Sequence, residues 1–273
     1  MIIVKPLAGL ANRMRVIDSA MSLSEQFRMP LKIAWNKERS LNCHYEELFL
    51  PVDEFTVSHS WYDSARTRIR PWESVSFILR ERLRLNVTIA GKTWIYDRHP
   101  SSLQDFDFSR LKDRKSVFIS TAHRFGTPAH IRKLKPVPHL AERIERACTG
   151  FSDKTIGIHI RRTDSRLSIE KSPDHLFFDN IRELIQKDDE VDFFLATDDA
   201  GLKARLQEAF PGKIISNRHK LGRDDCGGIQ NALVDMYCLS RTAKIYGSFY
   251  SSFSATAAMI TGIPIEILAA GSG

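Results

Sequence analysis

The sequence predicts an α/β protein made of two open domains that face each other across a cleft. Short apolar runs alternate with helical segments throughout the second half, and the first half begins with the same strand–turn–helix order. A proline- and glycine-rich stretch at residues 123–139 is typical of a linker. We therefore expect an N-terminal α/β domain over residues 1–138 and a Rossmann-like C-terminal domain over residues 139–273, each with a mainly parallel sheet.

The first half starts with a strand at residues 2–4, which leads through a turn at Gly9 into a long helix over about residues 10–27. Its later elements are less regular. Strands are expected at residues 31–35, 94–96 and 117–120, and an arginine-rich helix at about residues 74–85.

The second half alternates regularly between the two kinds of element. Buried strands are expected at residues 155–160, 192–197, 213–216, 243–248 and 264–268. Apolar residues at helical spacing predict helices at residues 175–186, 200–210, 229–241 and 253–261, with a glycine-rich loop through Gly227 and Gly228 before the third. Ligands of such folds bind at the carboxyl ends of the strands.

Composition limits the class of protein. With 273 residues the chain can bury about 70–75% of its unfolded surface, so it needs no covalent staples. Its cysteines are scattered singly, which favours small buried hydrophobes in a reducing compartment over a disulfide or zinc framework. No apolar stretch approaches the ~20 residues that span a bilayer, and no targeting segment is evident, so a cytoplasmic location is expected.

The positive charge lies in the middle of the chain. Residues 61–150 carry 18 Lys and Arg against 9 Asp and Glu, so the net charge of +7 comes entirely from this stretch. The stretch forms either a solvated basic face or a surface that attracts an anionic substrate, a membrane or nucleic acid. It lacks the spaced aromatic residues of an RNA-binding module, which argues against a nucleic-acid partner.

The strongest local signal is His159-Ile-Arg161-Arg162-Thr-Asp164, directly after a predicted buried strand. An arginine there could grip phosphate oxygens and stabilise a departing diphosphate without a metal ion. Alternatively, the arginines form structural ion pairs with Asp164 or Asp199. Two further strand ends carry related signals. Ser251 and Ser252 precede a helix whose N-terminus could bind phosphate or simply be capped, and Asn12 in the Gly9 turn could contact a ligand or cap its helix.

Two acidic positions complete the candidates. Asp198 and Asp199 end another strand, and helix capping fits them better than metal binding because adjacent carboxylates at a strand end point apart. Asp235, on the helix after the glycine-rich loop, could accept hydrogen bonds from a base such as guanine, or pair with Arg241. We expect no metal site and no cofactor.

In combination and order, these motifs resemble those of the fucosyltransferase superfamily that includes α1,6-fucosyltransferases, the nodulation fucosyltransferase and protein O-fucosyltransferases. The match rests on the HxRRxD motif at residues 159–164, on residues 194–199, on residues 235–240 with residues 250–254, and on the turn at residues 9–12. It is firm over roughly residues 155–262 and otherwise confined to residues 9–13.

The resemblance implies a GT-B-like fold that binds GDP-fucose mainly through its C-terminal half, inverts the anomeric configuration and needs no divalent metal. Carried over, Arg161 binds the β-phosphate, and His159 and Asp235 contact the guanosine. The remaining donor contacts fall on the HxRRxD motif, the serine motif and the first turn. They are Gly9, Asn12, Arg162, Asp164, Ser251, Ser252 and the backbone of Phe253.

The chain departs from the α1,6 enzymes after this motif. The lysine and glutamate expected there are replaced by Ser165 and Ile169, which leaves Glu170 as the candidate general base, or else as a solvated loop residue, with Asp164 a weaker candidate. This departure affects the acceptor linkage and leaves the donor chemistry intact.

We therefore predict transfer of fucose from GDP-fucose to a hydroxyl of a glycan or lipid-linked glycan in cell-surface polysaccharide assembly, with peripheral membrane contact. The alternatives are another GDP-sugar donor on the same fold, or a non-catalytic binder of an anionic glycan or RNA.

Overall fold

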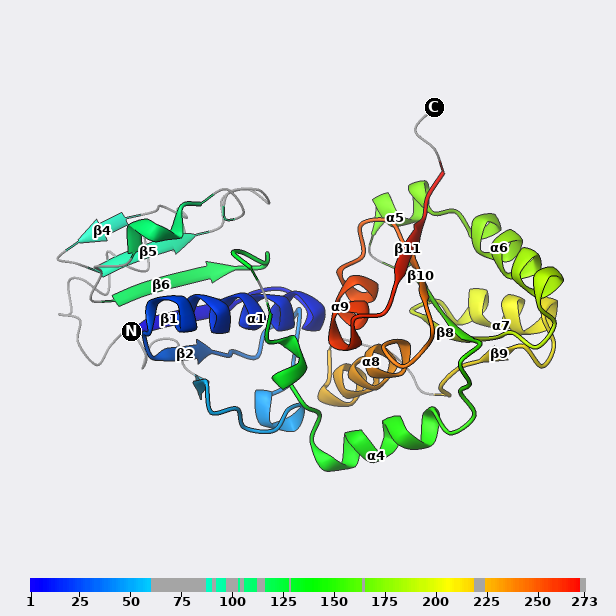
Figure 1. Ribbon diagram of the computed structural model, residues 1–273, viewed down its shortest axis with the longest axis horizontal. Coiled ribbons are helices and arrows are strands. Elements are labelled where there is room, and N and C mark those ends of the chain that lie inside the picture. Colours follow the sequence, from blue (N-terminus) through cyan, green and yellow to red (C-terminus); the bar gives the residue numbers. More distant parts are fainter. Residues whose placement is uncertain are drawn as a thin grey trace. The chain divides into compact units, whose positions relative to one another are not determined.

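The chain divides into two compact units in a computed structural model, which describes residues 1–59, 87–89, 92–96, 103, 106–111, 116–127, 129–163, 165–218 and 224–270. Unit 1 comprises Met1–Val137 together with Arg223–Cys226, and unit 2 comprises Pro138–Gly222 and Gly227–Gly273. The short segment Arg223–Cys226 thus clusters with unit 1 although it lies far along the chain. Figure 1 shows the elements of each unit.

Unit 1 is built on a sheet with the strand order β3-β2-β1-β6-β5-β4, in which the described strands pair in parallel except β4 with β5. The strands are β1 (Ile2–Pro6), β2 (Leu31–Ala34), β3 (Phe55–Ser58), β4 (Val87–Ile89), β5 (Lys92–Tyr96) and β6 (Ser116–Thr121). Helix α1 (Leu10–Phe27) follows β1 and buries an apolar face that includes Met14, Ile17 and Met21. Short 3₁₀ helices occupy Tyr45–Glu47 (η1), Phe108–Leu111 (η2) and Ile131–Lys133 (η3).

Unit 2 has a parallel five-stranded sheet in the order β11-β10-β7-β8-β9. Its strands are β7 (Thr155–Ile160), β8 (Asp192–Thr197), β9 (Ile214–Ile215), β10 (Ile245–Ser248) and β11 (Ile265–Leu268). Its helices are α4 (Pro138–Ala147), α5 (Arg166–Lys171), α6 (Asp174–Lys187), α7 (Ala200–Ala209), α8 (Cys226–Leu239) and α9 (Ser252–Thr261). Figure 1 shows α6 and α7 on one face of this sheet and α8 and α9 on the other.

The apolar core of unit 2 explains this layering. Phe177 and Ile181 of α6 and Leu202 and Leu206 of α7 are buried against the middle strands, whose inward side chains include Ile158 and Phe193. Because helices cover both faces, strands β7 and β8 are apolar along nearly their whole length.

Most predicted elements agree with the structure, including the strands at residues 155–160 and 192–197, whereas several short elements were missed. The helix predicted at residues 10–27 is α1, and those near residues 175–186 and 253–261 are α6 and α9. Strand β3 and helices α4 and α5 were not predicted, because elements of four to ten residues carry little periodicity. Helix α8 begins at Cys226, so Gly227 and Gly228 lie in its first turn and not in a loop. The predicted helix at residues 74–85 lies outside the described residues.

Gly157 in β7 lets the end of helix α8 and the segment that leads from it to β10 pack closely against the sheet. A Cβ atom at this position would lie 2.7 Å from Oγ1 of Thr242, 3.0 Å from Cδ2 of Leu239 and 3.2 Å from Cγ1 of Ile245. Thr242 cannot turn away without losing hydrogen bonds from its Oγ1 to the carbonyl groups of Leu239 and Lys244. Gly157 is therefore a packing requirement at the centre of unit 2.

We expect Gly157→Ala to lower the free energy of unfolding by about 1–3 kcal/mol, the usual cost of overpacking a dense core. Thermal unfolding followed by circular dichroism would measure this change. Gly150→Ala is the matched control, since a Cβ atom there meets nothing within 4 Å. Equal melting temperatures for the two variants would contradict the prediction.

The prediction for the cysteines is wrong for one pair. Cys43 and Cys226 form a disulfide between positions 183 residues apart, whereas Cys148 and Cys238 are free thiols. A bridge over so long a separation leaves no spacing signal in the sequence. The expectation of a reducing compartment rested on unpaired cysteines, so the cytoplasmic location loses that support.

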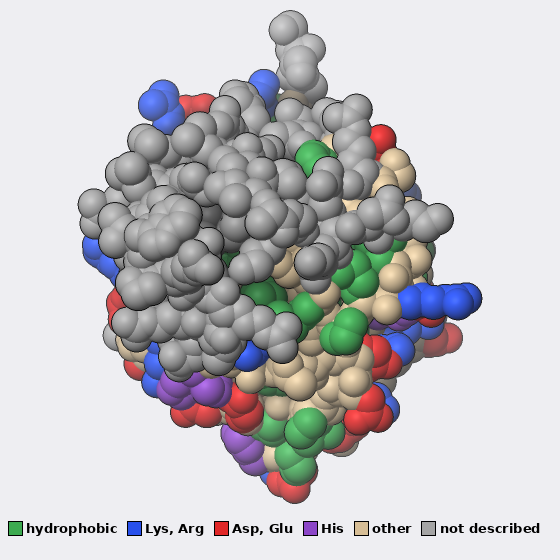
Figure 2. All heavy atoms as spheres, turned by 90° about the vertical axis from the view of Figure 1, so that its left-hand side faces the viewer, with side chains coloured by type: hydrophobic (Ala, Val, Ile, Leu, Met, Phe, Trp, Pro, Cys, Tyr) green, Lys and Arg blue, Asp and Glu red, His purple; other side chains and the backbone are tan. Residues whose placement is uncertain are grey.

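Charged residues of both signs are interspersed on the described part of one face (Figure 2). Figure 2 shows Lys and Arg side chains alternating with Asp and Glu around one face, without a large field of one sign among the coloured residues. Much of the basic stretch at residues 61–150 lies outside the described residues. No helix in the described part of the chain is long and apolar enough to cross a membrane.

Candidate functional site

The candidate site lies at the topological switch point of unit 2. Strand β7 pairs with β8 on one side and with β10 on the other, so the chain leaves the carboxyl ends of β7 and β10 toward opposite faces of the sheet. Open α/β sheets bind ligands at such a point. We use the name switch-point site for the residues that these strand ends bring together, which are His159, Arg161, Asp198, Ser248 and Ser251–Phe253.

Arg161 is held in place from two sides. Its backbone N–H donates to Oγ of Ser248 at 3.0 Å, and its Nη1 lies 2.9 Å from Oδ2 of Asp198. About one-fifth of the Arg161 side chain is exposed, so the guanidinium can still reach a ligand. The sequence motif alone suggested pairing with Asp164 or Asp199. Asp164 lies outside the described residues, and the partner within them is Asp198.

Asp198 organises the loop that follows β7. Its carboxylate accepts hydrogen bonds from the backbone N–H of Arg162 at 2.7 Å and from Oγ1 of Thr163 at 2.8 Å, besides pairing with Arg161. Burial alone raises the pKa of this carboxyl group, but Arg161 and the hydrogen bonds from Thr163 and Arg162 outweigh it and lower the pKa overall. Asp198 is therefore a fixed anion that orients Arg161. The adjacent Asp199 caps α7, as expected, by accepting from the N–H of Leu202 at 2.9 Å.

Arg162 points into the protein rather than toward a ligand. Each of its three side-chain nitrogens donates to a protein oxygen, namely Nε to Asp174, Nη1 to the Arg161 carbonyl and Nη2 to the Ser172 carbonyl, at 2.7–2.8 Å. Its guanidinium also lies over the ring of Phe177 at 5.7 Å. The guanidinium nitrogens that could bind phosphate are therefore already hydrogen-bonded to carbonyl and carboxylate oxygens. These contacts give Arg162 the role of positioning Arg161.

His159 is buried in the same place and is neutral. Its ring stacks on the ring of Phe253 with a centroid distance of 4.9 Å and an interplanar angle of 19°. Burial lowers the pKa of His159 to about 3, and the nearby Arg161 and Arg162 act in the same direction while Asp198 opposes them. Within the described residues its Nδ1 has no hydrogen-bond partner. A buried polar atom without a partner is costly, so this nitrogen is suited to contact a bound ligand.

The N-terminus of α9 adds backbone donors. Ser251 caps this ten-residue helix, with its Oγ accepting from the N–H of Phe253 at 3.4 Å, and Ser252 opens the first turn. The preceding residue, Tyr250, has a φ of 56°, a left-handed conformation that is rare for a bulky side chain. The first turn of such a helix attracts phosphate through its N–H groups and its dipole.

One serine within α5 and one at its C-terminal end fix the loop that leads to α9. Oγ of Ser168 donates to the carbonyl of Phe249 at 2.7 Å, and Oγ of Ser172 accepts from the N–H of Phe249 at 2.8 Å. Both backbone groups of Phe249 are thereby satisfied. The loop is held just where Tyr250 takes its strained conformation, and neither serine was predicted from the sequence.

Asp235 does not pair with Arg241, which was one of its two predicted roles. The carboxylate of Asp235 accepts from Nδ2 of Asn217 at 2.6 Å, and Arg241 pairs instead with Glu145 of α4. Asp235 lies on α8 and is 5% exposed. Its contact with guanine stays a prediction.

Three further predicted residues belong to other elements. Glu170 is on the exposed side of α5, where its Oε1 accepts from Nε of Arg166 at 2.6 Å. Gly9 and Asn12 belong to unit 1. Gly9 precedes α1 and a Cβ atom there would meet only the Ser40 carbonyl at 3.9 Å, while Oδ1 of Asn12 accepts from Arg15 at 2.7 Å.

The turn at Gly9 is held by Arg13, which the sequence motif includes. The fully buried Arg13 donates from Nε to the carbonyl of Ala8 at 2.9 Å and from Nη1 to the carbonyl of Asn36 at 2.7 Å. It thereby stabilises Ala8 at a φ of 64°, directly before α1. Arg13 therefore has a structural role in unit 1.

The two largely parallel sheets with their helices place the chain in the α/β class of folds. No family model and no curated protein matches the sequence, but solved structures do. NodZ α-1,6-fucosyltransferase co-crystallised with GDP is 20% identical, with a TM-score of 0.60 over 97% of this chain and 93% of that chain. A NodZ from Bradyrhizobium is 19% identical over 97% of this chain and 94% of that chain, also with a TM-score of 0.60.

Two further solved structures extend the comparison. A mutant of Arabidopsis thaliana FUT1 in complex with GDP is 15% identical, with a TM-score of 0.63 over 98% of this chain and 69% of that chain. POFUT1 in complex with GDP-fucose is 11% identical, with a TM-score of 0.59 over 98% of this chain and 97% of that chain. These likenesses show a shared fold, and they confirm the GT-B-like class that the sequence motifs implied.

Proposed function

We propose that this chain is a fucosyltransferase that moves fucose from GDP-fucose to a hydroxyl group of a glycan acceptor. The observation that carries the proposal is Arg161, whose guanidinium pairs with Asp198 and whose backbone is held by Ser248, at a sheet switch point beside the N-terminus of α9. The fold supports it, because the similar solved structures include fucosyltransferases bound to GDP or GDP-fucose.

The donor would lie with its diphosphate between Arg161 and the first turn of α9. Ser251, Ser252 and the N–H of Phe253 would supply neutral donors, and Arg161 the charge. Nδ1 of the neutral His159 and the carboxylate of Asp235 would contact the guanosine. Gly9 and Asn12 of unit 1 stay predicted contacts from the family motif.

The reaction would be a single displacement at the anomeric carbon. The acceptor oxygen forms a bond to this carbon while the bond to the β-phosphate oxygen breaks, and the electron pair goes to the departing GDP. Arg161 and the α9 N–H groups stabilise the charge that develops on the diphosphate, so the step needs no metal ion. One displacement inverts the configuration.

The acceptor proton would pass to a base, for which Glu170 is our candidate. Its carboxylate is half-exposed and pairs with Arg166 on the preceding turn, so it must leave this arginine to act. A strongly dissociative path, in which the bond to GDP breaks early, would reduce the demand on this base. We propose a glycan or lipid-linked glycan acceptor and a cytoplasmic location with peripheral membrane contact.

Donor choice is tested by calorimetric titration with GDP-fucose, GDP-mannose and UDP-glucose in the presence of a chelator. Because Asp235 favours guanine, we expect GDP-fucose to bind more tightly than UDP-glucose, and to bind without a metal because Arg161 supplies the positive charge. Stronger binding of GDP-mannose would shift the proposal to another donor on the same fold. If no nucleotide sugar binds, a salt titration with RNA and an acidic glycan would test the non-catalytic alternative, since polyanion binding weakens steeply with salt.

A further inference from the structure

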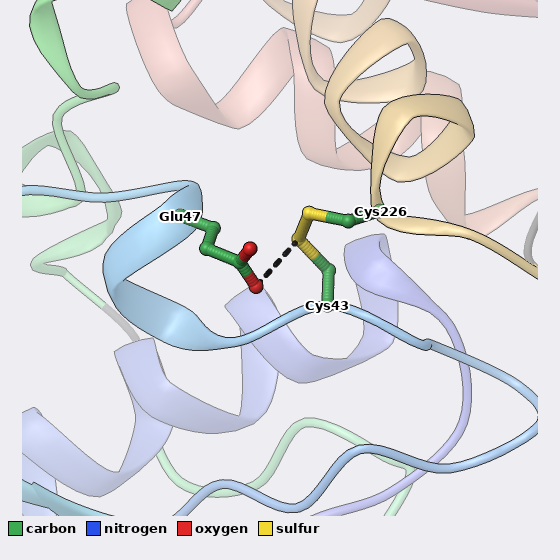
Figure 3. Close-up of side chains that lie close together, drawn as sticks. All are labelled: Cys43, Glu47 and Cys226. Carbon is green, nitrogen blue, oxygen red and sulfur yellow. Dashed lines mark hydrogen bonds between the residues drawn. A yellow bond between two sulfur atoms is a disulfide. The ribbon is translucent and has the colours of Figure 1, made fainter.

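A second cluster of reactive side chains lies in unit 1, outside the switch-point site. Cys43 in the loop after β2, Glu47 in η1 and Cys226 at the start of α8 place their sulfur and carboxylate atoms within 4.8 Å of one another. Figure 3 shows the Glu47 carboxylate pointing toward the disulfide, with its Oε2 3.7 Å from Sγ of Cys43. In the described residues no other group of three or more His, Cys, Asp and Glu side chains converges in this way.

The cluster is held by surrounding hydrogen bonds. Nε1 of the fully buried Trp35 donates to the Cys43 carbonyl at 2.9 Å, and the backbone N–H of His44 donates to Oε2 of Glu47 at 2.8 Å. Outer partners of this kind orient metal ligands. The ring of Tyr45 packs edge-on against Trp35 at 5.6 Å, which fixes η1 on the same support.

The two cysteines stay near each other without their bond. Nδ2 of Asn42, the neighbour of Cys43, donates to the carbonyl of Asp224 at 2.7 Å, two residues before Cys226. Reduction of the disulfide therefore leaves two thiols and a carboxylate in one place. The contact between Glu47 and Cys43 becomes a hydrogen bond only in that state, because a disulfide sulfur carries no proton.

The charges of the reduced cluster call for a cation. Two thiolates and a carboxylate within 4.8 Å repel one another strongly, and the chain can relieve this with protons, a sulfur–sulfur bond or a bound divalent ion. Two sulfur ligands and one oxygen fit Zn²⁺, whereas Mg²⁺ and Ca²⁺ take six or more oxygen ligands. Glu47 and Cys226 are only partly buried, so water can take a fourth position.

We propose that Cys43, Glu47 and Cys226 form a zinc site that exists in the reduced protein and is replaced by the disulfide on oxidation. A dithiol reductant supplies two electrons and two protons, which break the sulfur–sulfur bond and give two thiols as the reductant becomes a disulfide. Zn²⁺ then displaces the thiol protons. The sulfurs separate to about 3.8 Å, the spacing of two thiolates on a tetrahedral zinc. A disulfide oxidant reverses the sequence and releases the ion.

The test is zinc binding to the full chain, measured by competition with a chromophoric chelator after reduction with a dithiol and its removal under anaerobic conditions. We expect one Zn²⁺ per reduced chain and none after oxidation. Cys43→Ser and Cys226→Ala should each weaken binding at least about 100-fold, the upper end of the loss caused by removing a residue that merely supports a ligand. Glu47→Gln should weaken binding less, because its amide oxygen can still face the ion but carries no charge.

Cys148→Ser is the matched control, because Cys148 is a free thiol in unit 2 and should not change the affinity. Cobalt titration adds a readout that does not depend on stability, since thiolate ligation gives a sulfur-to-cobalt absorption band that Cys43→Ser should lose. The proposal is overturned if the reduced chain binds no zinc, or if only Cys148→Ser abolishes binding. It does not rest on the proposed transferase function.

Discussion

Replacing Arg161 by alanine should lower the rate of fucosyl transfer from GDP-fucose about a thousand-fold. Loss of one fixed donor to a developing oxyanion costs 10²–10³ in rate, and a charged arginine finger contributes at least as much. Arg161 is suited to this role because Asp198 and Ser248 hold it before the ligand arrives, so no reorganisation is needed in the transition state. Release of GDP from GDP-fucose, with water or a glycan as acceptor, measures the rate.

Two further variants make this result interpretable. Arg161→Lys keeps the positive charge but loses the bidentate hydrogen bonds of the guanidinium, so it should retain an intermediate rate. Arg182→Ala makes the same truncation at an exposed ion pair on α6 and should leave the rate unchanged. The loop of Arg161→Ala should keep its shape, since Asp198 still binds Arg162 and Thr163. A rate within tenfold of the unmodified protein would remove Arg161 from the chemistry.

Unit 2 should lose stability as the pH falls from about 6.5 toward 3, because of His159. Burial lowers the pKa of this histidine to about 3 in the folded chain, whereas it is about 6.5 when unfolded. The unfolded chain therefore binds the extra proton first, and the stabilisation, complete above pH 6.5, is lost on acidification. The full loss is on the order of 5 kcal/mol. Most of it arises while Asp198 and Asp174, whose pKa values are lowered, are still ionised.

Urea unfolding at pH 7 and pH 4.5, followed by circular dichroism, would measure this loss. His159→Phe keeps an aromatic ring against Phe253 but cannot titrate, so its stability should change by clearly less between the two pH values. His175→Asn is the control, because His175 is exposed on α6 and should behave like the unmodified chain. Equal pH dependence of all three proteins would show that His159 does not control acid stability.

Much of the fold was accessible from the sequence because its main signals are local. The apolar stripe of α1 and the alternation of strands and helices in unit 2 need only the chain itself. Because Arg161 directly follows a buried strand, the sequence also predicted that it lies at the carboxyl edge of the sheet, where ligands of such folds bind. Strand order, by contrast, depends on pairings between distant segments, so the switch point between β7 and β10 appeared only in the structure.

The supporting residues of the site could not be predicted for the same reason. Asp198 was interpreted as a helix cap, yet the adjacency of β7 and β8 turns it toward Arg161, while Asp199 does cap α7. Ser168 and Ser172 are ordinary surface-type residues in the sequence, and only the packing of α5 brings them to Phe249. Sequence reasoning therefore found the charged residue at the centre of the site, and the structure found the groups that hold it.

The strand order also sets the sequence of events while the ribosome makes the chain. Strand β7 pairs at Gly157 with Ile245 of β10, so one edge of β7 stays unpaired until the later strand emerges, roughly ten seconds afterwards at ordinary rates of translation. An unpaired strand edge is a template for aggregation during that interval. Cys43 likewise stays a thiol until Cys226 has been synthesised. The nascent chain therefore passes through a stage in which unit 1 still carries a reactive thiol and unit 2 still exposes the edge of its central strand.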